Sequence, residues 1–147
     1  MAKEELRLPD EMSFEMGSLL EPLSVAMHAK DRAGMPLGGA TVLVLGAGAV
    51  GLLCAAVCKT EQAKVLIADI NQDRLDFAVM NGFADAAVLV PMLRPETVDG
   101  KLEFAKDVAE AIRTAPVRGG VAGEPLVSFE CTGVEACLQT AIYVSVL

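Results

Sequence analysis

The stretch at residues 40–58, ATVLVLGAGAVGLLCAAVC, carries no charged residue, and Thr41 is its only clearly polar one. Such a run allows two structures: a membrane-spanning helix, or a buried strand that turns directly into a helix. Gly46, Gly48 and Gly51 interrupt its middle. Its first half is β-branched, its second half is rich in Ala and Leu, and it has no aromatic belt. The pattern therefore favours a strand, a tight turn and a helix over a membrane anchor.

The glycines of this stretch form the pattern G-x-G-x-x-G. Gly46 would allow a tight exit from the strand, Gly48 would let a pyrophosphate approach the backbone, and Gly51 would let the helix pack close to the strand. The free N–H groups and the positive dipole end of the following helix also favour phosphate. Alone the motif is weak evidence, because glycines in a turn can be purely structural. Here it lies between a predicted strand and a predicted helix, the context that a dinucleotide site requires.

Asp69 ends the next predicted strand, at about the 20-residue separation from the glycines that dinucleotide-binding domains use. A carboxylate there can accept hydrogen bonds from the adenosine ribose hydroxyls. It would repel a 2′-phosphate, so it favours NAD over NADP. The alternative is that Asp69 only caps the helix that follows.

Strands and helices are predicted to alternate along the chain. The predicted strands are 41–46, 63–70, 84–90 and 126–133, and the predicted helices are 49–61, 71–82, 102–115 and 134 onwards. This order predicts βαβ units and a parallel sheet with right-handed crossovers. The expected fold is therefore α/β: a Rossmann-like, doubly wound parallel sheet, preceded by an N-terminal helical segment. The expected strand order of such a sheet is 3-2-1-4-5-6, and only four of these strands can be counted in this chain.

The segments outside this alternation are less regular. Ser13 is expected to cap the first helix, and residues 16–34 have helical periodicity that Pro22 is expected to interrupt. Residues 93–101 are interpreted as a polar loop and residues 116–125 as a Gly/Pro loop. The segment 91–123 suggests no function.

The composition limits the kinds of partner. The formal net charge is −8 and the pI is about 4.6, which argues against nucleic acid or an anionic membrane as the main partner. With one histidine and no C-x-x-C pair, the chain does not predict a closed structural zinc site. The N-terminus lacks the apolar segment of a secretory signal, so a reducing, cytoplasmic location is expected. The cysteines are then expected to be small buried residues: Cys54, Cys58, Cys131 and Cys137.

Four segments in this order resemble the zinc-dependent medium-chain dehydrogenases: LLEPLSVAMHA, VLVLGAGAVGLL, ADINQDRLDFA and ECTGVEACLQTAI. The resemblance is strongest to the polyol branch, the sorbitol, xylitol and L-arabinitol dehydrogenases. It covers nearly the whole chain from about Leu8. It implies NAD-dependent oxidation of a polyol or secondary alcohol to a ketose by hydride transfer, assisted by zinc in the complete enzyme. It also implies a homo-oligomer.

The same resemblance implies the residues that contact the cofactor. The glycine loop would lie at the pyrophosphate, with contacts from Gly46, Gly48, Ala49, Val50 and Gly51. Asp69 and Ile70, at the end of a strand, would hold the adenosine ribose, and Arg74 would lie at the adenosine end. Thr132 and Gly133, where the last strand ends, would line the cleft.

Glu21 resembles the carboxylate that lies at the catalytic zinc of this family; alternatively it is an exposed helix residue before a proline. The family's other zinc ligands, a Cys and a His-Glu pair, have no counterpart in this sequence, nor has its four-cysteine structural zinc lobe. Residues 1–38 are therefore expected to link from a catalytic domain, and residues 39–147 to be a partial NAD-binding domain, truncated after about four strands. Such a chain would hold no zinc and be inactive alone.

Two other functions are compatible with parts of the pattern. A non-catalytic NAD sensor would carry the same glycine loop and strand-end Asp. A methyltransferase would have a different glycine loop and a different fourth-strand motif. The segment LLEPLSVAMHA, upstream of the first strand, favours the dehydrogenase.

Overall fold

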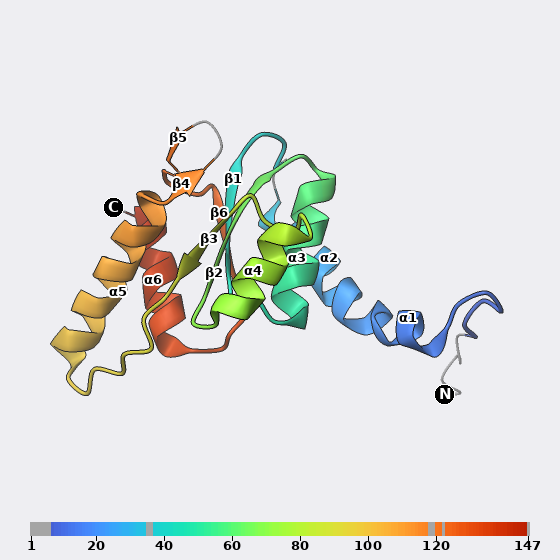
Figure 1. The fold of residues 1–147 in the computed structure, drawn as a ribbon, viewed down its shortest axis with the longest axis horizontal. Coiled ribbons are helices and arrows are strands. Elements are labelled where there is room, and N and C mark those ends of the chain that lie inside the picture. Colours follow the sequence, from blue (N-terminus) through green and yellow to red (C-terminus); the bar gives the residue numbers. More distant parts are fainter. Residues whose placement is uncertain (1–6, 35–36, 118–119, 122, 147) are drawn as a thin grey trace.

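The computed structural model describes residues 7–34, 37–117, 120–121 and 123–146. Its centre is a parallel sheet of four strands in the order β3-β2-β1-β6 (Figure 1). The strands are β1 (Thr41–Leu45), β2 (Lys64–Asp69), β3 (Ala86–Leu89) and β6 (Val127–Glu130). The predicted α/β class, the four strands and their order are confirmed.

The strand β1 lies in the middle of the sheet and pairs with β2 on one side and β6 on the other. Val44, for example, lies opposite Ile67 of β2 and Phe129 of β6. Because parallel strands point the same way, the carboxyl ends of these three strands meet at one edge. The loops that follow them lie along the lower side of the sheet in Figure 1.

Helices cover both faces of the sheet (Figure 1). The helices α3 (Ala49–Thr60) and α4 (Gln72–Met80) lie on one face, and α5 (Val98–Arg113) and α6 (Glu135–Val146) lie on the other. Neighbouring residues of β1 point to opposite sides, so Val44 packs towards α3 while Leu43 packs towards α5 and α6. Both are fully buried, which is why the strand is continuously apolar in sequence.

The N-terminal segment forms two helices, α1 (Phe14–Ser18) and α2 (Leu20–Ala33). The side chain of Ser13 accepts a hydrogen bond from the Met16 N–H, so the predicted cap is confirmed. The predicted interruption at Pro22 is wrong: the break falls at Leu19, and Pro22 lies in the first turn of α2. A proline is tolerated there because the N–H that it lacks would have no carbonyl partner within the helix.

The helix α2 packs against α3, and its Ala26 is fully buried. Lys30 of α2 forms an ion pair with Glu61, directly after α3. The hydrogen bond between them raises the pKa of Lys30 and lowers that of Glu61. The segment before the first strand is therefore attached to the face that α3 covers.

The helix α5 begins earlier than the sequence predicts. The Thr97 hydroxyl accepts a hydrogen bond from the Gly100 N–H and caps the helix, so residues 98–101 belong to α5 and not to a loop. The predicted loop at 116–125 contains a short antiparallel pair, β4 (Pro116–Val117) and β5 (Gly120–Val121). Residues 118–119 and 122 of that prediction lie outside the described residues.

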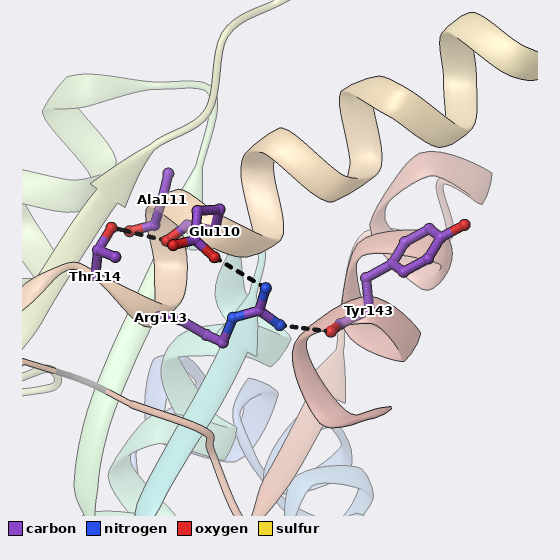
Figure 2. Close-up of polar contacts among 5 residues, drawn as sticks. All are labelled: Glu110, Ala111, Arg113, Thr114 and Tyr143. Atoms are coloured by element: carbon purple, nitrogen blue, oxygen red, sulfur yellow. Dashed lines mark hydrogen bonds and ion pairs between the residues drawn. The ribbon is translucent and has the colours of Figure 1, made fainter. Parts of the chain in front are cut away.

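Arg113 joins α5 to the end of α6 (Figure 2). Its guanidinium donates one hydrogen bond to the Tyr143 carbonyl at 2.8 Å and another to the Glu110 carboxylate at 3.0 Å. The Tyr143 carbonyl belongs to the last turn of α6, where carbonyls have no partner within the helix. Arg113 therefore caps α6 and fixes the two helices as one layer.

Candidate functional site

The glycine loop leaves β1 at the carboxyl edge of the sheet. Gly46 has a φ of 102°, which other residues rarely adopt. A Cβ on Gly46 would also lie 2.8 Å from the Thr132 methyl group and 3.4 Å from the Cys131 backbone. Gly46 thus brings the exit of β1 against the exit of β6.

Gly51 lies where α3 crosses the exit of β1. A Cβ at this position would lie 1.8 Å from the Gly46 carbonyl oxygen and 3.4 Å from a methyl group of Val44. The first of these is backbone and cannot rotate away. Only glycine permits this approach of helix and strand.

Gly48 has a different environment from its neighbours in the motif. It is the N-cap of α3, with extended backbone at φ −80° and ψ −175°, and a Cβ there would meet nothing within 4 Å. The next residues, Ala49 and Val50, open α3, and its first turn has no acidic side chain. The first N–H groups of a helix have no carbonyl partner within it, so they are available to an anion.

Asp69 ties the glycine loop to the end of β2. Its side chain is buried; Oδ2 accepts the Ala47 N–H at 2.6 Å and Oδ1 accepts the Asn71 N–H at 2.9 Å. Asn71, not Asp69, caps the helix that follows, by accepting from the Arg74 N–H. Each carboxylate oxygen keeps a second lone pair that a hydroxyl group can use.

Ile70 and Arg74 continue from Asp69 along the same rim. Ile70 directly follows β2 and is exposed, and Arg74 lies exposed in the first turn of α4. An exposed apolar side chain and an exposed guanidinium, which follow a fixed carboxylate in the sequence, suit the flat base and the ribose of a nucleoside.

Thr132 and Gly133 form the turn after β6, on the other side of β1 from Asp69. Both are exposed, and Gly133 has a φ of 69°. The Glu130 carboxylate accepts the N–H groups of both residues. Glu130 is not among the residues that the sequence predicts for the site; the signal for it in the sequence is a carboxylate three residues before a glycine at a strand end.

Glu21 is not joined to this edge. It lies exposed in the first turn of α2, and no hydrogen bond or ion pair within the described residues links its carboxylate to the glycine loop. The parts of the chain that the structure describes hold no group of three or more His, Cys, Asp or Glu residues that could bind a metal ion.

Two of the four cysteines, one on α3 and one directly after β6, lie close together. The Sγ atoms of Cys54 and Cys131 are 3.9 Å apart; the hydrogen bond between them lowers the pKa of Cys54 and raises that of Cys131. Burial raises the pKa of Cys58 to about 11. Cys54 and Cys58 are buried, as predicted, whereas Cys131 and Cys137 are only half-buried.

The apolar stretch 40–58 is divided between β1, the glycine loop and α3, and the membrane alternative is not supported. Over the described ranges, no helix has the length and apolar character needed to cross a bilayer. A parallel sheet with a glycine-rich turn between its central strand and a helix, and a carboxylate at the end of the next strand, defines a Rossmann-type dinucleotide-binding domain.

Comparison with known proteins agrees with this class. Residues 24–124 match the family described as alanine dehydrogenase/PNT, C-terminal domain. Sorbitol dehydrogenase of Macaca fascicularis is 38% identical over 138 residues, which is 93% of this chain and 34% of the relative. L-arabinitol 4-dehydrogenase of Aureobasidium melanogenum is 42% identical over 133 residues, 90% of this chain and 32% of the relative.

Solved structures show the same fold. The 2R,3R-butanediol dehydrogenase of Bacillus subtilis is 28% identical, with a TM-score of 0.63 over 95% of this chain and 35% of that one. The L-idonate 5-dehydrogenase of Escherichia coli is 25% identical, with a TM-score of 0.64 over 93% of this chain and 34% of that one. The chain belongs to the family that these matches define, the polyol branch of the zinc-dependent medium-chain dehydrogenases, and corresponds to its coenzyme-binding part. It spans about a third of the length of the curated relatives it matches.

Proposed function

We propose that the carboxyl edge of this sheet binds NAD, with the pyrophosphate against the start of α3. The observation that carries the proposal is the contrast within the glycine motif. Gly46 is closed in by the Thr132 methyl group and Gly51 by the Gly46 carbonyl, whereas Gly48 faces open space at the positive end of a helix. A glycine that the fold itself does not need is best explained by a ligand that approaches the backbone at that point.

The adenosine half of NAD would bind on the β2 side of this loop. Asp69 would accept hydrogen bonds from the ribose hydroxyls, with Ile70 and Arg74 beside the adenosine. Two backbone N–H groups already hold the Asp69 carboxylate in place, so little ordering is needed when the ribose binds. A 2′-phosphate would meet this carboxylate directly, which is why NAD is favoured over NADP.

The nicotinamide half would bind on the β6 side, along Thr132 and Gly133. The dinucleotide of a doubly wound sheet crosses the loop of the central strand at the point where the strand order reverses. In this sheet β1 is that strand, with β2 and β6 on its two sides. The protein's contribution is to hold the reactive ring in position; the redox chemistry belongs to the cofactor.

For the whole protein we propose NAD-dependent oxidation of a polyol to a ketose, in which a hydride passes from the carbinol carbon to the nicotinamide ring. The support is the similarity to sorbitol and L-arabinitol 4-dehydrogenases. In such an enzyme Glu21 would lie at a zinc whose other ligands come from outside this chain. The described residues do not form a metal-binding group by themselves.

The remaining parts of the proposal concern organisation. Residues 1–38 would connect the catalytic domain to the NAD-binding domain at 39–147. The whole protein would be a cytoplasmic homo-oligomer with a polyol substrate and no nucleic-acid or membrane partner. The acidic net charge of −8 supports the last point.

Isothermal titration of the purified chain with NAD and with NADP tests the central part. We expect saturable binding of NAD, with NADP weaker by about ten-fold or more, corresponding to about 1.4 kcal/mol. Absence of NAD binding, or tighter binding of NADP, would contradict the proposal.

A further inference from the structure

Two carboxylates stand on either side of the central strand, and each ends a neighbouring strand. Asp69 ends β2 and accepts N–H groups of the loops after β1 and β2. Glu130 ends β6 and accepts N–H groups of the turn that follows it. The proposed function gives Asp69 a direct contact with the ligand, at the adenosine ribose, but gives Glu130 none.

The Glu130 carboxylate is almost fully engaged by its own turn. Its Oε1 accepts the Thr132 N–H at 2.7 Å, and both oxygens accept the Gly133 N–H, at 3.2 and 3.0 Å. The Thr132 hydroxyl also donates to Oε1 and accepts the Val134 N–H at 3.0 Å. These oxygens are directed at the backbone, so Glu130 does not present itself to a ligand.

The turn depends on this anchor. The ladder bond from the Cys131 N–H to the Leu45 carbonyl, at 2.9 Å, joins β6 to the end of β1. The next two residues are exposed, and Gly133 has the left-handed φ of 69°. Without a carboxylate to accept hydrogen bonds from their N–H groups, Thr132 and Gly133 would sample other conformations.

The turn at Thr132 and Gly133 also affects the shape of the glycine loop. The Thr132 methyl group fills the space beside Gly46, where a Cβ would lie only 2.8 Å away. Asp69 fixes the opposite side of the same loop through the Ala47 N–H. Both walls of the β1 exit are thus set by a strand-end carboxylate.

We propose that Glu130 is a positioning residue for the nicotinamide half of the dinucleotide: it holds Thr132 and Gly133 in the conformation that lines this half of the cleft. The inference rests on the proposed NAD site. It follows from the sheet order, because β6 lies across β1 from the carboxylate that would bind the adenosine ribose. Loss of Glu130 should therefore weaken contacts to the nicotinamide nucleoside and spare those to adenosine diphosphate.

The test compares NAD with ADP, which lacks the nicotinamide nucleoside, on three variants by calorimetry. We expect Glu130→Ala to weaken NAD binding about ten-fold, which is the scale of hydrogen bonds to a charged group. ADP binding should weaken by less than about two-fold. Glu130→Gln keeps an amide oxygen that can accept both N–H groups, and should restore NAD binding to within about three-fold of the parent chain. Glu135→Ala is the matched control, since this exposed carboxylate on α6 pairs only with Lys101 and Gln139 in the described residues; it should change neither affinity.

Each other outcome overturns the inference. Equal losses for NAD and ADP in Glu130→Ala, with a lower melting temperature, would show a purely structural role. Unchanged NAD binding would show that the turn does not contact the nicotinamide half. If the parent chain binds neither ligand, the proposed function itself fails, and this result is distinct from the first two because no variant is needed to see it.

Discussion

Replacing Gly51 with alanine adds a methyl group between α3 and the exit of β1. The new Cβ would lie 1.8 Å from the Gly46 carbonyl oxygen and 3.0 Å from the carbonyl carbon. Even to reach 3.0 Å from the oxygen, the helix or the loop must move by the difference, about 1.2 Å, against a packed core. The neighbour is backbone, so no side-chain rotation can relieve the contact.

We expect Gly51→Ala to destabilise the protein, although replacing glycine with alanine within a helix usually has a stabilising effect. In an ordinary helix, alanine is more favourable than glycine by about 1 kcal/mol. Overpacking of a core generally costs about 1–3 kcal/mol and sometimes more, and a backbone contact belongs to the upper end. We therefore expect Gly51→Ala to lower the free energy of unfolding by about 2 kcal/mol and the melting temperature by about 6 °C.

Gly48→Ala is the matched control within the same motif. Its Cβ would meet nothing within 4 Å, and its φ of −80° suits any residue. Stability should change by less than about 1 kcal/mol, but NAD binding should weaken by about ten-fold or more because the methyl group occupies the place of the pyrophosphate. Urea unfolding followed by circular dichroism measures the first effect, and calorimetry with NAD measures the second.

The two variants should therefore separate folding from binding. A Gly51→Ala chain as stable as its parent would refute the close packing of α3 on β1. A Gly48→Ala chain that binds NAD like its parent would refute the placement of the pyrophosphate at the start of α3.

Two further predictions concern a carboxylate and a buried thiol. Asp69→Ala leaves the buried Ala47 N–H without its acceptor, so urea unfolding should show that the free energy of unfolding falls by about 1–3 kcal/mol. Calorimetry should show a smaller preference for NAD over NADP. An unchanged free energy of unfolding would contradict the contact between Asp69 and Ala47. Burial raises the pKa of Cys58 from its ordinary 9.0 to about 11, so the folded state favours the neutral thiol. That contribution to stability is fully present below pH 9 and is lost as the pH rises through 11, by at most about 2–3 kcal/mol. Urea unfolding between pH 8 and about pH 11 should therefore show a shallower decline in Cys58→Ala than in the parent chain, and equal slopes would refute this.

The sheet and its order could be predicted because their signals are local and agree with one another. The apolar β1, the glycines after it and the carboxylate at the end of β2 each have one simple interpretation, and all three point to the same fold. The right-handed crossover then limits the strand order without any knowledge of contacts.

The errors lie where a local rule has two outcomes. Pro22 predicts a break in a helix interior but is well tolerated in a first turn, and the sequence does not say where that turn begins. The start of α5 depends on the cap at Thr97, whereas the prediction relied on apolar residues that begin at Leu102. Both errors concern the ends of helices and not their presence.

The carboxylate contacts could not be predicted for a different reason. The bond from Ala47 to Asp69 joins residues 22 positions apart and depends on the pairing of β1 with β2. The engagement of Glu130 depends on the turn conformation at Gly133, which is a result of folding. Sequence patterns suggest which side chains ligands need, but not which backbone groups those side chains hold.

Backbone amide NMR of the 15N-labelled chain during titration with NAD reports where on the protein the dinucleotide binds. We expect saturable chemical-shift changes at Gly48–Gly51, at Asp69 and Ile70, and at Thr132 and Gly133, together with small changes along α5, which lies on the far face of the sheet. We expect ADP to shift the first two groups but not the third. Shifts concentrated outside the carboxyl edge of the sheet, or no shifts at saturating NAD, would contradict the proposed NAD site.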